Sequence, residues 1–239
     1  MERALKRLRR AVIRVLDVGK VEKLDKVMRT SVTSLLEGIV KVLEVHIQQV
    51  SIVYLGFTWL NVGPTGKAYQ RTTEAVKDTL TTLFDACFVL ARIRLDPGNV
   101  DTYTPSVHLL ECAVTAVNGT TAVLNPSDSA NFLRCISGAY HNLGGTLYKA
   151  NKYGGAIRFL RQGCDVGFRA LQLHTSRHDD KEAREDVHPR EEEESERNKE
   201  GWKQLEEQLF RRYELLGVCY SKIGDRKVRS IHVILIKHF

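Results

Sequence analysis

Five cysteines are the side chains of this 239-residue chain best suited to nucleophilic or metal chemistry. Thiolates act as nucleophiles in cysteine proteases and as ligands in zinc sites, where paired cysteines stand about two residues apart. No two of the five have that spacing, and each lies within an apolar helical pattern: Cys87, Cys112, Cys135, Cys164 and Cys219. We therefore predict buried structural thiols in a reducing compartment, and neither a zinc site nor a redox dithiol.

Histidine and glycine patterns were the other candidates for chemistry. His174 and His178 are four residues apart, which places two imidazoles on one helix face, but no glutamate of a zinc-protease helix lies between them. Gly144-Gly145 and Gly154-Gly155 follow no predicted strand, so they are interpreted as helix-packing or turn glycines rather than a phosphate-binding loop. The sequence predicts no metal site, no cofactor and no catalytic residue in this chain.

The elements that position these side chains are predicted to be helices. An apolar fraction of 43%, only five prolines and long stretches without turn signals favour helices over sheet. Breaks at residues 63–66 and 96–99 separate three helical segments, with Pro105 expected in the first turn of the third. One buried helix face between residues 20 and 60 is predicted from Leu35, Leu36, Ile39, Val42, Leu43 and Ile47. We predict an all-α fold, an α-α superhelix of antiparallel helix pairs.

Residues 140–171 have the spacing of a tetratricopeptide-like repeat, in which two helices pack antiparallel. Such a pair needs small residues where the helices touch and large apolar residues around that point. Gly144 and Ala156 are the small residues, and Asn151-Lys152 is the predicted turn. The positions that define the repeat are Tyr140, Leu143, Gly144, Leu147, Ala156 and Leu160. The repeat is predicted over residues 137–171, within a helical-repeat region of residues 1–174.

The first half of the pattern recurs at Tyr213, Leu216, Gly217 and Tyr220, followed by a turn at residues 223–225. The small residue expected twelve positions after Gly217 is missing, because that position holds Arg229. Residues 201–239 are therefore predicted to form a half-repeat with an atypical end, as in a truncated or wrongly spliced product. Helix pairs of this kind bury their apolar faces by stacking, and they serve as binding surfaces more often than as enzymes.

A charged insertion is predicted between the repeats, over residues 175–200. From Asp179 to Glu200 there are 11 acidic and 5 basic residues, a net charge of −6, and the whole chain carries +7, so the remainder carries +13. With almost no apolar side chains, the insertion is predicted to be a disordered, solvated loop or a frayed helical extension. It could cover the strongly basic surface of the rest of the chain.

Two further segments bear on membranes and targeting. The longest apolar run, residues 50–62, is too short for a membrane span and contains Gly56 and Asn61, so no membrane partner is predicted. The Arg-rich, amphipathic start at residues 3–16 suits a mitochondrial presequence or an acidic surface. It equally suits packing on the next helix, which Glu2, Asp17 and the apolar stripe favour: Leu5, Leu8, Ile13 and Leu16.

The basic surplus predicts an acidic partner. Nucleic-acid binding needs cations interleaved with stacking aromatics, whereas Tyr and Phe here fall mostly on apolar repeat positions. An extended acidic or phosphorylated polypeptide is therefore the preferred partner. In a tetratricopeptide-like pair the first helix lines the concave groove, and counting from the motif predicts these contact residues: His141, Tyr148, Lys149, Arg211, Val218 and Lys222. An ordinary surface role is the alternative for each of them.

The amino-acid sequences of the two repeats resemble the helical-repeat arm of fungal separase. The resemblance lies in AYHNLGGTLYKANKYGGAIRFLRQGC (139–164) and WKQLEEQLFRRYELLGVCYSKIGDRK (202–227), and more weakly in residues 83–116. It implies a superhelical arm that binds the inhibitor securin along an extended path. In that family the arm precedes a cysteine endopeptidase domain, which cleaves the kleisin subunit of cohesin at anaphase. No position here matches the catalytic histidine and cysteine of the family.

Three hypotheses for function follow. The first is a non-catalytic scaffold resembling part of the separase arm, with a securin-like partner, an indirect link to cohesin in chromosome segregation, and a place in cytoplasm and nucleus. The second is a stand-alone tetratricopeptide-type adaptor for an unrelated peptide. The third is a helical-repeat protein that binds nucleic acid. Salt-dependent binding of an acidic peptide in preference to RNA or DNA separates the first two from the third.

Overall fold

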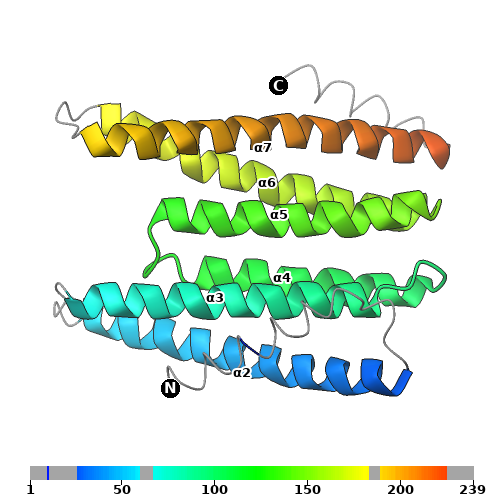
Figure 1. Cartoon of the computed structure of the whole chain (residues 1–239), viewed down its shortest axis with the longest axis horizontal. Helices are drawn as coiled ribbons and strands as arrows, with labels where there is room; N and C mark the ends of the chain where they lie inside the picture. Colours follow the sequence, from blue (N-terminus) through cyan, green and yellow to red (C-terminus); the bar gives the residue numbers. More distant parts are fainter. Residues whose placement is uncertain (1–9, 11–25, 60–66, 183–188, 225–239) are drawn as a thin grey trace. The chain divides into compact units, whose positions relative to one another are not determined.

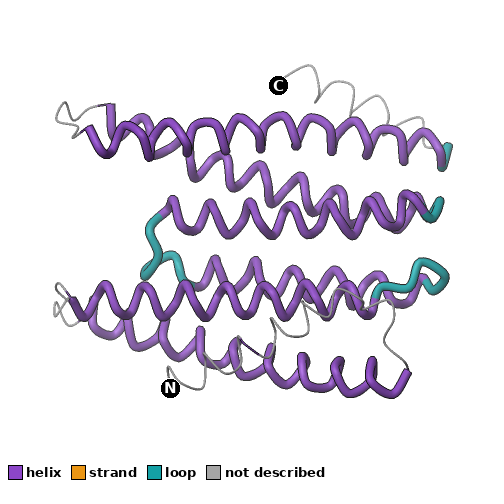
Figure 2. Tube along the Cα trace, in the orientation of Figure 1, coloured by secondary structure: helices purple, strands orange, loops and turns teal. Residues whose placement is uncertain are grey.

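The structure, a computed structural model, describes residues 10, 26–59, 67–182 and 189–224. These residues form six α-helices and one 3-10 turn and include no strand (Figures 1 and 2). The all-α prediction is confirmed. The chain divides into two compact units, residues 1–125 and 126–239, in each of which successive helices run in opposite directions. The boundary lies at Asn125-Pro126, within the predicted helical-repeat region of residues 1–174. The Arg-rich start at residues 3–16 lies outside the described residues except for Arg10.

The first unit contains α2 (Lys26–Trp59), α3 (Lys67–Arg94) and α4 (Tyr103–Gly119). Helix α3 is the central one, because α2 and α4 both pack mainly against it and less against each other. Its apolar residues recur every three or four positions and are fully buried, among them Leu80, Leu83, Cys87 and Leu90. Burial of each such side chain stabilises the fold by about 1.5–3 kcal/mol.

Helix α2 is apolar on two faces, which corrects the prediction of a single buried face. Leu36, Ile39, Leu43 and Ile47 are buried against the unit as predicted. Leu35 and Val42, assigned to the same face, are instead 51% and 59% exposed, together with Val45 and Ile52. The reason is geometric: in a helix that turns 100° per residue, positions 35 and 42 lie about 100–120° around the helix from Leu36.

The connection from α3 to α4 is fixed by side chains that accept backbone hydrogen bonds. Gly98 N donates to Asp96 Oδ1 at 2.8 Å, and Asp101 N donates to Asn99 Oδ1 at 3.0 Å. The short helix η2 (Val100–Thr102) follows directly, and Pro105 lies in the first turn of α4, as predicted. Asp and Asn are common in such turns because their short side chains reach nearby backbone amides.

The second unit contains α5 (Pro126–Lys149), α6 (Tyr153–Glu182) and α7 (Pro189–Lys222). Helices α5 and α6 meet at the predicted turn. Asn151 has φ 60°, Lys152 N donates to Leu147 O at 2.9 Å, and Asn151 N donates to Tyr148 O at 2.9 Å. This pair of bonds around a left-handed residue satisfies the last carbonyls of α5 and ends the helix. Tyr153 Oη donates to Asn151 Oδ1 at 2.8 Å and holds the turn side chain.

The contact between α5 and α6 is close at three glycines. A Cβ atom added to Gly144 would lie 2.9 Å from Leu160 Cγ and 3.2 Å from Phe159 Cβ. A Cβ on Gly163 would lie 3.1 Å from Tyr140 Cβ, and one on Gly167 would lie 2.7 Å from Ser137 Oγ. Sequence reasoning missed Gly163 and Gly167, although both continue the small-residue spacing of Ala156 along α6. The helix pair also extends well beyond the predicted 137–171.

Much of the predicted insertion is helical in the described residues. Helix α6 continues to Glu182 and α7 begins at Pro189, so of the two predicted forms the helical extension applies to residues 175–182 and 189–200. The second half-repeat lies on the last turns of α7. Gly224 ends them with φ 79°, at the predicted turn. A Cβ on Gly217 would meet no described atom within 4 Å, and residues 225–239, which would carry the facing helix, lie outside the described residues.

Candidate binding sites

The predicted partner contacts divide between exposed and half-buried positions. Lys149, at the end of α5, is exposed. Tyr148 is half-buried and its ring lies 5.7 Å from that of Tyr153 in an edge-to-face arrangement. His141 is half-buried, and its Nδ1 is buried without a hydrogen-bond partner among the described residues. His141 therefore lies toward the interior of the unit, whereas Lys149 is available to a partner.

Three predicted contacts form one exposed stripe on α7, which we call the α7 stripe: Arg211, Val218 and Lys222. Steps of seven and four residues return to the same side of a helix. All three side chains are exposed, and Val218 is 41% exposed in spite of its apolar side chain. The buried residues of α7 lie on its other side and include Leu205, Leu209, Leu216 and Cys219. The α7 stripe thus presents two cations flanking an apolar side chain, and the exposed carboxylates of Glu207 and Glu214 lie on the same side of the helix.

The interior side of α7 carries a buried arginine. Arg212 is 3% exposed, its Nη1 donates to Ser137 Oγ, and its Nη2 donates to Gln208 Oε1 at 3.2 Å. Ser137 Oγ in turn donates to Gly163 O at 2.6 Å, which ties all three helices together. Arg212 Nε has no hydrogen-bond partner among the described residues. Sequence reasoning missed this residue because arginine is ordinarily a surface residue.

Burial, and for two groups the charge of Arg212, shifts the pKa values of side chains around Arg212. Burial lowers the pKa of His141, and the positive charge of Arg212 lowers it further. Burial raises the pKa of Cys164 to about 12 in spite of the opposing effect of Arg212. Burial, with the nearby Cys164 and Asp165, raises the pKa of Tyr213 to about 12. Around neutral pH the thiol and the phenol are protonated, so Arg212 is the charged group at the centre of this unit.

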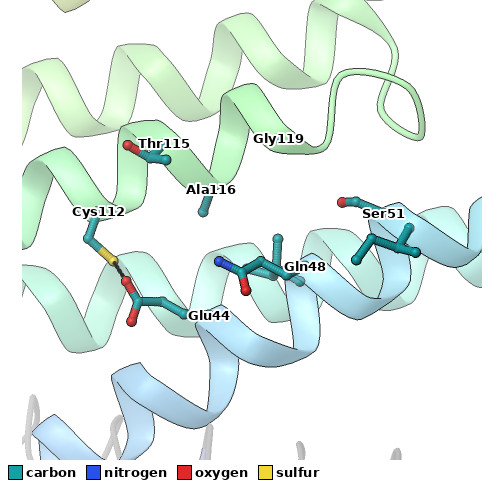
Figure 3. A pocket seen from close by; sticks show the side chains of 9 residues that line it. Glu44, Gln48, Ser51, Cys112, Thr115, Ala116 and Gly119 are labelled. Atoms are coloured by element: carbon teal, nitrogen blue, oxygen red, sulfur yellow. Dashed lines mark hydrogen bonds between the residues drawn. The ribbon is translucent and has the colours of Figure 1, made fainter. Parts of the chain in front are cut away.

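The first unit contains a groove between α2 and α4, of about 450 Å³ (Figure 3). Glu44 and Cys112 lie at one end, Gln48 and Ala116 in the middle, and Ser51 and Gly119 at the other end. Ile47, Ile52 and Thr115 complete the lining. The volume is within the range of small-molecule pockets. We call it the α2–α4 groove; nothing in the sequence pattern predicted it.

A chain of hydrogen bonds closes one end of the α2–α4 groove. Cys112 Sγ donates to Glu44 Oε1 at 2.7 Å, and Cys87 Sγ lies 3.9 Å from Cys112 Sγ. The hydrogen bond with Cys87, burial and the Glu44 carboxylate all raise the pKa of Cys112. Cys112 is therefore a protonated donor and a poor nucleophile.

The remaining candidates for chemistry have structural surroundings. Cys87, Cys164 and Cys219 are buried as predicted and Cys112 is half-buried, but Cys135 is exposed on α5, so the prediction was wrong for that residue. His174 stacks on Trp202 with ring centroids 4.1 Å apart, and the guanidinium of Arg134 lies 5.6 Å from the Trp202 ring centroid. The side chain of His178 lies outside those described. Within the described residues, no three His, Cys, Asp or Glu side chains form a group that could hold a metal ion.

Comparisons with known proteins assign no family to this chain. No protein-family model and no curated protein matches it. Among solved structures it is similar to the chain of the DHF79 filament, with 8% identity and a TM-score of 0.48 over 99% of this chain and 98% of that one. That likeness supports no conclusion about function. None of the described helices is long and apolar enough to cross a membrane.

Proposed function

We propose that this chain is a non-catalytic helical scaffold that binds an extended acidic polypeptide, with the α7 stripe as part of the binding surface. The observation that carries the proposal is the joint exposure of Arg211, Val218 and Lys222 on one side of α7. The opposite side of the helix is anchored in the core by residues such as Leu209 and Leu216. A rigid helix that displays cations beside an apolar side chain suits a peptide with acidic and apolar residues.

The charge of the chain supports an acidic partner. Outside the segment from Asp179 to Glu200 the chain carries +13, and such a surplus attracts acidic molecules and speeds their association. Under this proposal the family that the repeats resemble suggests a particular partner: in separase, the helical arm binds securin and supports cleavage of the cohesin kleisin subunit. The same surface would serve a stand-alone adaptor equally well.

The test is binding of a labelled 20-residue peptide of alternating Glu and Leu, measured by fluorescence anisotropy at 50, 150 and 400 mM salt. We expect salt-dependent binding that the variant R211E/K222E weakens by about tenfold, or ~1.4 kcal/mol. The control R71E/R92E changes the net charge equally at two exposed residues of α3 and should bind like the original chain.

Binding of a single-stranded DNA of 20 nucleotides is measured under the same conditions for comparison. Tighter binding of DNA than of the peptide, with the same dependence on Arg211 and Lys222, would favour the nucleic-acid hypothesis. An equal loss of peptide binding in R211E/K222E and R71E/R92E would show that only net charge matters, and would contradict the α7 stripe as the binding surface.

A further inference from the structure

The α2–α4 groove has a polar group at each end and a mostly apolar lining between them, which the Gln48 amide interrupts. Glu44 offers a carboxylate at one end, and Ser51 offers a hydroxyl about two helical turns away, a rise of roughly 10 Å along α2. Ile47 and Ala116 lie between them. The groove exists because α2 and α4 both pack mainly on α3, while the small residues Ala116 and Gly119 leave space along α4.

Both polar ends have unused hydrogen-bonding capacity. The one hydrogen bond that the described residues give Glu44 comes from the Cys112 thiol, and they give its carboxylate no ion pair. The hydroxyl of Ser51 is buried and has no hydrogen-bond partner in the described part of the chain. A buried hydroxyl without a partner is unfavourable, and rotation of the Ser51 side chain toward the groove would let a ligand atom satisfy it.

We propose that the α2–α4 groove is a binding site for a primary amine on an apolar body. The ammonium group donates to the Glu44 carboxylate, the apolar body lies along Ile47 and Ala116, and a polar atom of a longer ligand reaches Ser51. The Cys112 thiol holds the carboxylate toward the groove. This chemistry could come from a free amphiphilic amine or from a lysine side chain of a polypeptide. The site is independent of the α7 stripe. It prefers a cationic ligand, whereas the α7 stripe is proposed to bind an acidic one.

The probe is 4-phenylbutylamine, titrated into the full chain and followed by amide chemical shifts. We expect shifts in residues 44–52 and 112–119 and a Kd of about 1 mM, as for other fragments of this size. The control ligand 4-phenylbutanoate has a similar apolar body and the opposite charge, and should bind at least fivefold more weakly. Equal binding of the two ligands in the α2–α4 groove would overturn the proposal.

Two kinds of variant test the groove itself. Glu44→Gln keeps an acceptor for Cys112 but removes the charge, so the amine should bind at least fivefold more weakly and lose its advantage over the carboxylate. Thr115→Trp fills the groove from an exposed position and should abolish binding, whereas Thr104→Trp, at an exposed position elsewhere on α4, should not. Gly119→Leu is a second filling variant, since a Cβ there meets no described atom within 4 Å. Unchanged amine binding in Glu44→Gln, or in both filling variants, would contradict the site.

A short peptide, acetyl-Leu-Lys-Leu-amide, separates the two sources of the amine. Binding of either probe in the α2–α4 groove supports the proposal, and the tighter one assigns the source. Failure of both probes to bind would overturn it.

Discussion

Gly144 and Gly145 are neighbours on α5 with different surroundings. A Cβ at Gly144 would lie 2.9 Å from Leu160 Cγ, whereas a Cβ at Gly145 would meet no described atom within 4 Å. Alanine is favoured over glycine in a helix by about 1 kcal/mol, and overpacking a core costs about 1–3 kcal/mol. We predict that Gly145→Ala raises the free energy of unfolding by ~0.5–1 kcal/mol and that Gly144→Ala lowers it by ~1 kcal/mol. Urea denaturation measures both, and shifts in the same direction would contradict the close α5–α6 contact.

His141 should make the protein less stable in acid. Its pKa in the folded state lies below that of an exposed histidine, about 6.5. As the pH falls through that value the unfolded state takes up a proton first, so stability drops from about pH 7 downward until the folded pKa is reached. Arg212→Met removes the neighbouring cation and should make this drop smaller, and His141→Gln should remove the contribution of His141.

Urea midpoints at pH 5.5 and 7.5 for the original chain and the two variants test this prediction. Other histidines contribute equally to all three proteins, so the comparison isolates His141. An equal loss of stability in the three would show that His141 is not the responsible group.

Helix α2 provides a test at the level of an element, because neighbouring positions lie on different faces. Leu36 is fully buried and Leu35 is 51% exposed. Leu36→Ala should lower the free energy of unfolding by about 2–5 kcal/mol, through lost burial and a cavity. Leu35→Ala should change it by less than ~1 kcal/mol, since much of that side chain is already in water. Thermal or urea unfolding measures both changes. Equal losses of unfolding free energy would mean that Leu35 is buried like Leu36, and would contradict an exposed outer face on α2.

The helices could be predicted from the sequence where one local pattern determined the result. Tyr140, Gly144 and Ala156 predicted the helix pair, and Asn151 predicted its turn, because spacing and backbone conformation are local properties. The burial of Arg212 could not be predicted in this way, since it depends on Ser137 of α5 being brought against α7 by tertiary packing.

The exposed face of α2 and the α2–α4 groove could not be predicted from the sequence either. Periodicity located apolar residues on α2 but could not assign Leu35 and Val42 to a second face. The groove depends on how α2 and α4 pack on α3. The spacing of residues within either helix does not predict that packing. Candidate sites that lie between helices therefore required the structure.

The molecule as a whole has two candidate sites with opposite charge preferences, one in each unit. The α2–α4 groove of the first unit offers a carboxylate to a cation, and the α7 stripe of the second offers cations to an acidic chain. Both sites consist of side chains on long helices whose opposite faces are fixed in a core. The proposed scaffold would bind by displaying groups in fixed positions, which is the common use of stacked helix pairs.

Photo-crosslinking from the α7 stripe tests the proposed function most directly. With p-benzoylphenylalanine in place of Val218, the chain should crosslink to the acidic Glu/Leu peptide, and 400 mM salt should suppress the product. The matched control replaces Val100, which is 65% exposed on η2 of the first unit, and should give little product. Equal crosslinking from both positions, or none from position 218 under conditions where the peptide binds, would contradict the α7 stripe as the binding surface.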